Sequence, residues 1–235
     1  MTLDWNDLPG LFPGLQASDR WLPLLQRHLA LISAAGPHGR ATGVAPGDAV
    51  RRNYAESLEL LRIIDGAQGG PPLVDIGPGA GFPGLIIAAV QPAWEVHLLE
   101  PLKKRATLLE QLAAELGLPL VTVHPIRAEE AARGPLRETA ATVTARAVAP
   151  LRELLEYATP LAMPGGLLAL PKGSGVLDEL AEAPHALTAL RCEVEAVVRT
   201  RPEASETPYV VLVRKAGPTP RLYPRRPGIP HQRPL

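Results

Sequence analysis

The stretch Asp75-Ile-Gly-Pro-Gly-Ala-Gly81 decides the fold, because it places a glycine-rich turn between two apolar segments. The run Leu73–Ile76 before the turn has the length of a buried strand, and residues 84–90 after it have the composition of a helix. Such a turn brings backbone N–H groups and a helix N-terminus close to a ligand. The glycines follow a G-x-G-x-G spacing, whereas a dinucleotide-binding turn carries G-x-G-x-x-G. The acidic Asp75 suits a ligand amino group and would repel a pyrophosphate.

Strand-like and helix-like segments alternate after this turn. Strands are predicted over residues 94–99, 120–124, 142–145 and 167–170, and helices over 103–116, 151–161 and 176–190. Alternation with short loops is typical of a parallel sheet covered by helices on both faces. The last two strands, 193–199 and 208–215, have no helix between them and are expected to form an antiparallel hairpin. The sequence therefore predicts an α/β, Rossmann-like fold with a mostly parallel seven-stranded sheet and an antiparallel C-terminal hairpin.

Two segments of different composition flank the sheet domain. Residues 1–70 are a predicted N-terminal helical extension, because apolar residues recur at helical spacing at Leu22, Leu25, Leu29 and Ile32. A loop is expected over 36–47, and a second breaker over 66–72 marks the boundary to a domain over 71–216. Residues 217–235 are rich in proline and arginine, so they predict an extended basic tail rather than a packed element.

Composition narrows the class of protein. Lys and Arg balance Asp and Glu at 24 each, yet residues 207–235 hold five Arg and one Lys with no acidic residue. A neutral total disfavours a general nucleic-acid or DNA binder, and the basic end favours one local anionic contact. The single cysteine, Cys192, excludes an internal disulfide and favours a reducing compartment. With neither a signal-peptide pattern nor an apolar run long enough to span a bilayer, the chain is expected to be cytoplasmic and away from membranes.

An acidic residue also ends the second predicted strand. Glu100 stands 23 residues after Gly77, where a carboxylate can accept hydrogen bonds from both hydroxyls of a ribose. The G-x-G-x-G turn, with Asp75 two residues before it, resembles the first motif of S-adenosylmethionine-dependent methyltransferases. The six histidines and one cysteine show no metal-ligand spacing, so no metal is expected.

Five motifs follow one another over roughly residues 40–235: Val74-Asp-Ile-Gly-Pro-Gly-Ala-Gly-Phe-Pro-Gly84, Arg127-Ala-Glu-Glu130, Ala145-Arg-Ala-Val-Ala-Pro-Leu151, Lys172-Gly173 and Tyr223-Pro-Arg-Arg-Pro-Gly-Ile-Pro230. In content and order they resemble the bacterial 16S rRNA guanine-N7 methyltransferase family (RsmG, formerly GidB). The N-terminal region departs from the family pattern. Arg40-Ala-Thr42 stands in place of Asn-Leu-Thr, and Asn53 and Glu56 stand at the His and Asp of a His-x-x-Asp-Ser-Leu motif.

The resemblance implies a class I methyltransferase fold and methyl transfer from S-adenosylmethionine to N7 of a guanine in 16S rRNA or the small ribosomal subunit. Guanine N7 carries an exposed lone pair, so no general base is needed and no single acid or base is expected to be indispensable. Ala128 and Glu129 should flank the adenine, with Glu129 or a nearby backbone group reading its amino edge. The implied cofactor-binding residues are Asp75, Gly77, Gly79, Gly81, Phe82, Glu100, Pro101, Leu102, Ala128, Glu129 and Arg146.

Cationic side chains are the expected contacts with the substrate. Arg146 and Lys172 each follow a predicted strand and are candidates to position the guanine; a surface salt bridge and a solvated loop lysine are the respective alternatives. Arginine forks bind phosphates, and prolines keep a segment extended. The alternative for the tail is packing over the domain with Tyr223 buried. The chain is expected to act as a monomer, and the RNA-binding candidates are Lys172, Arg221, Arg225, Arg226 and Arg233.

The sequence disfavours two other classes of protein and leaves a third open. A short-chain NAD oxidoreductase would need the longer glycine pattern and Tyr-x-x-x-Lys, and Tyr157 is followed by Leu161 at the lysine position. The basic tail and the ordered motifs disfavour a methyltransferase of another RNA or of a small molecule. A catalytically weakened RNA-binding or assembly factor stays open because of Asn53.

Overall fold

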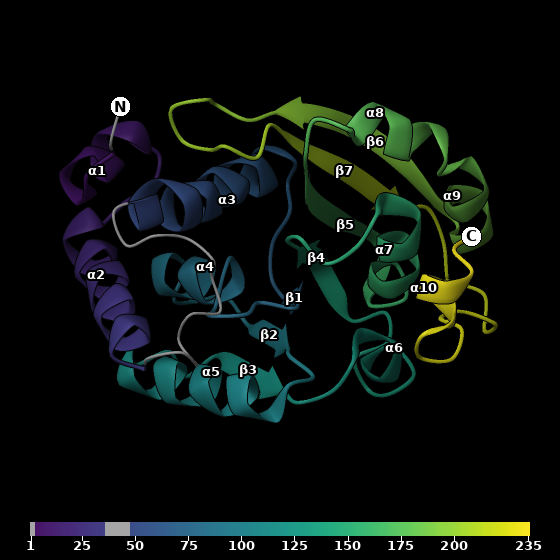
Figure 1. Ribbon diagram of the computed structural model, residues 1–235, viewed down its shortest axis with the longest axis horizontal. Coiled ribbons are helices and arrows are strands. Elements are labelled where there is room, and N and C mark those ends of the chain that lie inside the picture. Colours follow the sequence, from purple (N-terminus) through teal and green to yellow (C-terminus); the bar gives the residue numbers. More distant parts are fainter. Residues whose placement is uncertain (1–2, 36–47) are drawn as a thin grey trace.

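The computed structural model, which describes residues 3–35 and 48–235, is built around one seven-stranded sheet (Figure 1). The strand order is β3-β2-β1-β4-β5-β7-β6. β1 to β5 are parallel, and β7 pairs antiparallel with β5 and β6. The predicted fold class is therefore confirmed. The strands are β1 (Leu73–Ile76), β2 (Val96–Leu99), β3 (Val121–His124), β4 (Ala140–Ala145), β5 (Ala162–Lys172), β6 (Cys192–Arg199) and β7 (Tyr209–Lys215).

Helices connect the parallel strands, and a further set of helices precedes β1 in the chain. The long helices come close to their predicted bounds, and the loop over 36–47 with its motif at 40–42 lies outside the described residues. The helices are η1 (Trp5–Asp7), α1 (Leu8–Leu11), α2 (Ser18–Ala34), η4 (Val50–Ala55), α3 (Glu56–Gly66), α4 (Gly84–Val90), α5 (Lys103–Glu115), α6 (Ala128–Ala131), α7 (Leu151–Ala158), α8 (Val176–Ala181), α9 (Pro184–Leu190) and α10 (Ile229–Gln232).

Two predicted elements differ in extent from the observed ones. The helix predicted over 176–190 is two helices, because Pro184 occupies the first turn of α9 and provides no backbone N–H to continue α8. Strand β5 begins at Ala162 rather than at residue 167, since Ala140 of β4 pairs with Ala162 across a register irregularity. The added residues include Pro164 and Gly165, whose composition hid the strand.

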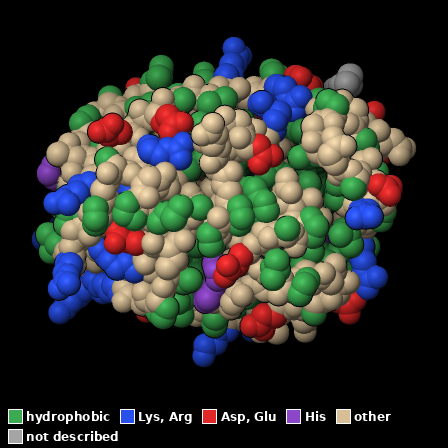
Figure 2. Space-filling view, turned by 180° about the vertical axis from the view of Figure 1, so that it is seen from behind, with side chains coloured by type: hydrophobic (Ala, Val, Ile, Leu, Met, Phe, Trp, Pro, Cys, Tyr) green, Lys and Arg blue, Asp and Glu red, His purple; other side chains and the backbone are tan. Residues whose placement is uncertain are grey.

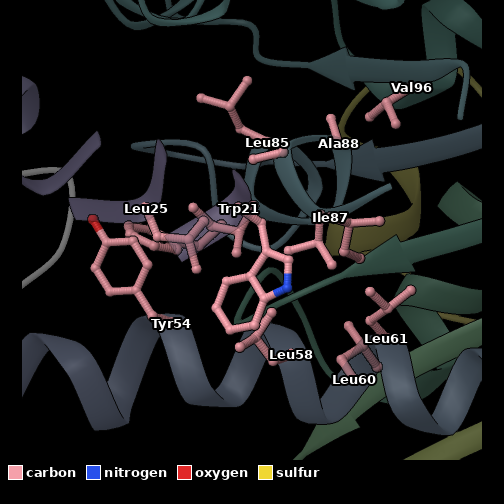
Figure 3. Close-up of a cluster of buried hydrophobic side chains, with 14 of the residues drawn as sticks. Trp21, Leu25, Tyr54, Leu58, Leu60, Leu61, Leu85, Ile87, Ala88 and Val96 are labelled. Carbon is pink, nitrogen blue, oxygen red and sulfur yellow. The ribbon is translucent and has the colours of Figure 1, made fainter. Parts of the chain in front are cut away.

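The sheet is buried on both faces. Alternate strand residues point to opposite faces, so Leu73 packs on one side with α2, α3, α4 and α5, and Val74 packs on the other with α6, α7 and α9. The N-terminal helices share the first of these clusters. Figure 3 shows Trp21 of α2 lying among side chains of α3 and α4. Each fully buried side chain of this size contributes about 2 kcal/mol, so the predicted helical extension is held to the sheet as part of its core.

The C-terminal segment (217–235) corrects a prediction. The sequence predicts an extended tail that is not packed, but the segment lies against α6 and α7 and contains the short helix α10 (Figure 1, yellow). Thr219, Pro224 and Pro230 are buried, and Tyr223 packs partly buried against the second cluster. Frequent prolines indicate that a segment lacks the regular backbone hydrogen bonds of a helix or strand. They do not exclude packing of that segment onto a neighbouring surface.

Among the helices within residues 3–35 and 48–235, none combines the length and the apolar character needed to cross a membrane.

Candidate functional site

A cavity of about 560 Å³ opens at the carboxyl ends of the central parallel strands. β1 pairs with β2 on one side and with β4 on the other, so the direction of strand order reverses beside β1. Open α/β sheets bind ligands at this point, and the volume is that of a site for a small organic ligand. The residues that line the cavity include Ile76, Gly77, Leu99, Glu100, Ala128, Glu129, Val148, Glu153, Tyr157, Gly228, His231 and Gln232.

Gly77 brings bare backbone to the cavity. It has a φ of 68°, a left-handed conformation that strains most side chains. A Cβ atom here would lie 3.2 Å from Cγ2 of Val148, which stands in the loop after β4. Both the conformation and the space therefore favour glycine, and the first residue after β1 can approach a ligand without a side chain in between.

Asp75 does not reach the cavity. It lies on the face of β1 that packs beneath α4, and its Oδ2 accepts a hydrogen bond of 2.7 Å from the backbone N–H of Gly84. Oδ1 is buried and has no hydrogen-bond partner among the described residues. Burial raises the pKa of Asp75 to about 8, although the Gly84 N–H and the charge of Arg146 oppose the shift. This geometry places Asp75 as a support of the turn and helix α4.

Two buried carboxylates contribute to the cavity from different elements. Glu100 follows β2 and is 3% exposed, and its Oε1 accepts a hydrogen bond of 3.0 Å from the backbone N–H of Leu102. Glu129 belongs to α6 and is 4% exposed, and its Oε1 lies 3.3 Å from the backbone nitrogen of Gly228. Each carboxylate is fixed on one oxygen and retains further acceptor positions. The pair suits a ligand that presents hydroxyl and amino donors, as the nucleoside part of S-adenosylmethionine does.

The predicted cofactor residues divide into two groups. One group lines the cavity and consists of Gly77, Glu100, Pro101, Leu102, Ala128 and Glu129. The other group lies outside the lining of this cavity and consists of Asp75, Gly79, Gly81, Phe82 and Arg146. The second group builds the turn beneath the cavity and the contacts behind it.

Arg146 directly follows β4 and faces the N-terminal helices. Its Nη1 donates to the carbonyl of Arg52 at 3.0 Å and lies 3.3 Å from Oε2 of Glu56, and its Nη2 donates to Oδ1 of Asn53 at 3.2 Å. The guanidinium also lies 5.4 Å from the centroid of the Phe82 ring. Burial lowers the pKa of Arg146, and the charges of Glu56 and Asp75 oppose that shift. Asn53 and Glu56, which depart from the family pattern, are therefore both partners of Arg146.

His28 is a site residue that the sequence analysis missed. Its Nε2 lies 2.9 Å from the carbonyl oxygen of Ala80, which can only accept, so Nε2 donates. Its Nδ1 lies 2.7 Å from the Tyr54 hydroxyl, and the ring packs edge-on against Phe82. Burial lowers the pKa of His28 to about 4, so the ring is neutral near pH 7. Helix α2 thus holds the glycine turn, and only a three-dimensional contact reveals this.

Lys172, a candidate to position the guanine and to bind RNA, is not the solvated loop lysine of the alternative interpretation. It is 6% exposed, and its Nζ donates to the carbonyl of Ala149 at 2.8 Å and to Oε2 of Glu179 at 2.7 Å. The same Glu179 oxygen accepts a hydrogen bond from the backbone N–H of Leu151, at the start of α7. Lys172 therefore holds the loop that connects β4 to α7, the loop that carries Val148.

The arginines of the C-terminal segment are not equivalent. Arg225 forms a forked ion pair with Glu156 of α7, whose side chain is fully buried. Arg221, Arg226 and Arg233 are exposed.

Within the described residues, no group of three or more His, Cys, Asp or Glu side chains is arranged to hold a metal ion.

A family model described as rRNA small subunit methyltransferase G matches residues 24–206. Among curated proteins, a "Ribosomal RNA small subunit methyltransferase G" of Desulfitobacterium hafniense is 41% identical over 192 residues, which are 81% of this chain and 79% of that protein. The protein of the same name from Roseiflexus castenholzii is 37% identical and covers 94% of this chain and 95% of its own length.

Two solved structures show the same fold at low sequence identity. Cofactor-bound Rv0187 from MTB has a TM-score of 0.61 and 18% identity, and the match covers 92% of this chain and all of that chain. TYW2 of P. horikoshii in complex with MeSAdo has a TM-score of 0.53 and 15% identity, and the match covers 69% of this chain and 62% of that chain.

Proposed function

The chain belongs to the rRNA small subunit methyltransferase G family, and from this premise we propose that it transfers a methyl group from S-adenosylmethionine to N7 of a guanine in 16S rRNA. The observation that carries the proposal is the cavity beside β1, where the bare Gly77 and the buried carboxylates Glu100 and Glu129 meet. Its volume and its acceptors fit an adenosine group, and its position at the reversal of strand order is that of a nucleotide-type ligand.

The reaction requires little of the protein beyond alignment of the methyl donor with guanine N7. When bound, S-adenosylmethionine would supply a methyl carbon on a positively charged sulfur. A lone pair that bonds to this carbon breaks the carbon–sulfur bond, and the sulfur leaves as the neutral thioether of S-adenosylhomocysteine. Guanine N7 offers such a lone pair without losing a proton, so the rate arises from orientation and exclusion of water. Glu100 and Glu129 hold the donor, and the loop carrying Val148 borders the place where a base would enter. Arg146 and Lys172 act as positioning residues for the turn and for this loop.

RNA contact is proposed for cations that the fold leaves accessible. Arg221, Arg226 and Arg233 are exposed on the C-terminal segment, and Arg105 and Arg127 line the cavity. Figure 2 shows acidic and basic side chains interspersed over one face of the molecule, with Lys and Arg gathered at its lower left. This distribution suits a neutral protein that meets RNA over a limited area. Lys172 and Arg225 are not among the proposed RNA contacts, because each forms an ion pair within the protein and supports its structure.

The proposal extends to the setting in which the protein acts. The residues of one chain suffice to bring Gly77, Glu100 and Glu129 together, so the proposed reaction needs no second copy and we propose a monomer. Cys192 is buried, and burial raises the pKa of its thiol to about 11, so little reactive thiolate is present near pH 7. The proposed location is the cytoplasm, where 16S rRNA is made and assembled. The partner is 16S rRNA, free or within the small ribosomal subunit.

The decisive experiment joins cofactor binding to methyl mapping. The wild-type chain is expected to bind S-adenosylmethionine in calorimetry, and Glu100→Gln should weaken binding about tenfold, because one charge-assisted hydrogen bond is lost. Glu110→Gln, an exposed position on α5, is the matched control and should bind as the wild type does.

The methyl group is then followed with a labelled donor and 16S rRNA. Reduction followed by aniline cleavage should break the product at the labelled guanine, which identifies N7. Label at another atom or in another RNA would indicate a different methyltransferase, and binding without any transfer would indicate a weakened RNA-binding factor.

A further inference from the structure

The C-terminal segment (217–235) is anchored to the sheet domain by ion pairs and charge-assisted hydrogen bonds. Arg225 donates from Nη2 to Oε2 of Glu156 at 2.6 Å and from Nε to Oε1 at 2.9 Å, and its backbone N–H donates to the same Oε1 at 2.8 Å. Nη2 also donates to the carbonyl of Arg233 at 2.7 Å, which closes the segment on itself. A buried carboxylate satisfied by a forked arginine is a strong and directional contact.

Two arginines of the sheet domain, Arg133 and Arg137, donate hydrogen bonds to the backbone of the same segment. Arg137 donates to the carbonyls of Tyr223 at 2.9 Å and Thr219 at 2.8 Å, and Arg133 donates to the carbonyl of Pro224 at 2.9 Å. These carbonyls have few intrachain backbone partners because prolines interrupt the segment, so the arginines satisfy them. Directional hydrogen bonds thus run both from the segment to the domain and from the domain to the segment. They fix the segment in one register on the domain.

This register brings the turn before α10 to the cavity. Gly228, His231 and Gln232 line it together with Glu100 and Glu129. The backbone nitrogen of Gly228 lies 3.3 Å from Oε1 of Glu129, and Nδ1 of His231 lies 3.3 Å from Oε1 of Glu153. Gly228 has a φ of 84°, so a residue with a side chain would be strained in the conformation that directs this N–H toward Glu129.

We propose that the C-terminal segment is a wall of the cofactor site, and that the N–H of Gly228 fixes the Glu129 carboxylate to read the amino group of adenine. The inference rests on the proposed function, because it assigns the adenosine end of S-adenosylmethionine to this cavity. With Oε1 held by Gly228, Oε2 of Glu129 is the oxygen available to the ligand. Arg225 is then a positioning residue that acts through the segment and not through RNA.

Neighbouring arginines allow a matched test. Arg225→Ala removes the clamp on Glu156, and Arg226→Ala removes the same charge from an exposed position one residue away. Affinity is measured by calorimetry for S-adenosylhomocysteine and for its inosine analogue, in which an oxo group replaces the adenine amino group. Arg225→Ala should bind S-adenosylhomocysteine about tenfold more weakly, and its preference over the inosine analogue should fall. Arg226→Ala should match the wild type in both.

A readout on RNA separates the two arginines further. The salt slope of RNA binding should drop by about one for Arg226→Ala and stay unchanged for Arg225→Ala. Gly228→Ala is the second variant, because it leaves the clamp on Glu156 intact and strains only the turn at the cavity. It should also reduce the preference for adenine over hypoxanthine, even if Arg225→Ala folds poorly.

The outcomes distinguish a failure of this inference from a failure of the proposed function. If the wild type binds S-adenosylhomocysteine while Arg225→Ala and Gly228→Ala keep its full affinity and base preference, the C-terminal segment is no part of the site and the inference is overturned alone. If the wild type itself binds no S-adenosylhomocysteine, the proposed function is overturned and the inference falls with it.

Discussion

His28 influences the site through the backbone of the glycine turn. It donates to Ala80, accepts from Tyr54 and packs against Phe82, so one neutral ring joins α2, η4 and the turn. A protonated ring could not accept from the Tyr54 hydroxyl and would carry a charge in an apolar cluster. The turn is therefore supported by a residue whose contribution depends on pH.

The pKa of His28 gives that dependence a sign. The folded value of about 4 lies below the ordinary value of 6.5, so His28 stabilises the fold above pH 6.5 and this contribution is lost as pH falls through 4. In His28→Gln, the free energy of unfolding should vary less between these limits than in the wild type, by up to about 3 kcal/mol. Urea unfolding at several pH values measures the free energy of unfolding of both proteins. Asp75 contributes to both with the opposite sign, so its contribution cancels when one profile is subtracted from the other. His185→Gln, at an exposed position, should leave the wild-type profile unchanged; a profile as steep in His28→Gln would contradict the assignment.

At the scale of elements, α8 stabilises the loop that borders the cavity. Its Glu179 accepts from the first residue of α7 and pairs with the buried Lys172, which in turn holds Ala149. One carboxylate thus satisfies a helix N-terminus and a buried cation at the same time. The loop between β4 and α7 is short and lies under this pair, so its conformation depends on α8.

Glu179→Ala should lower the free energy of unfolding by about 2 kcal/mol, because Leu151 loses its cap and Lys172 is left unpaired. The control is Glu182→Ala, at the C-terminal end of the same helix. It loses only an exposed pair with Arg152 at 3.5 Å and should change stability by less than about 0.5 kcal/mol. Equal losses in both variants, measured by urea unfolding, would show that Lys172 finds another partner.

Periodicity was sufficient for the elements that bury a regular face. The run before Gly77 and the helix after it lie where the pattern places them, because both are buried throughout and, apart from Asp75, carry only apolar residues or glycine. The C-terminal segment has no such period, since its contacts are carbonyls and arginines supplied by distant residues. Glu100 and Glu129 could be located from strand ends and motif order. Asp75 could not be placed correctly from spacing alone, because its role depends on which face of β1 it occupies.

At the scale of the whole molecule, the ligand and the fold are coupled. Residues of the cavity come from β1, β2, α6, α7 and the C-terminal segment, so unfolding any of them removes part of the site. A ligand that binds only the folded chain stabilises all of these elements together. The N-terminal helices share their core with the sheet and should unfold in the same transition.

Thermal unfolding provides the measurement. With S-adenosylhomocysteine at about 100 times its Kd, the fold should gain about 2.7 kcal/mol, and Tm should rise by about 5 to 10 °C. For a monomer, Tm should not change with protein concentration. A midpoint that rises with protein concentration would instead indicate that association contributes to the folded state.

The contact between Gly228 and Glu129 joins positions 99 residues apart. Bringing such distant positions together costs chain entropy before any contact rewards it, so pairings of this kind form late. A refolding chain should recover its helices and sheet first and its ability to retain a nucleoside afterwards. The same order is expected during synthesis, because residues 217–235 are made after all seven strands of the sheet.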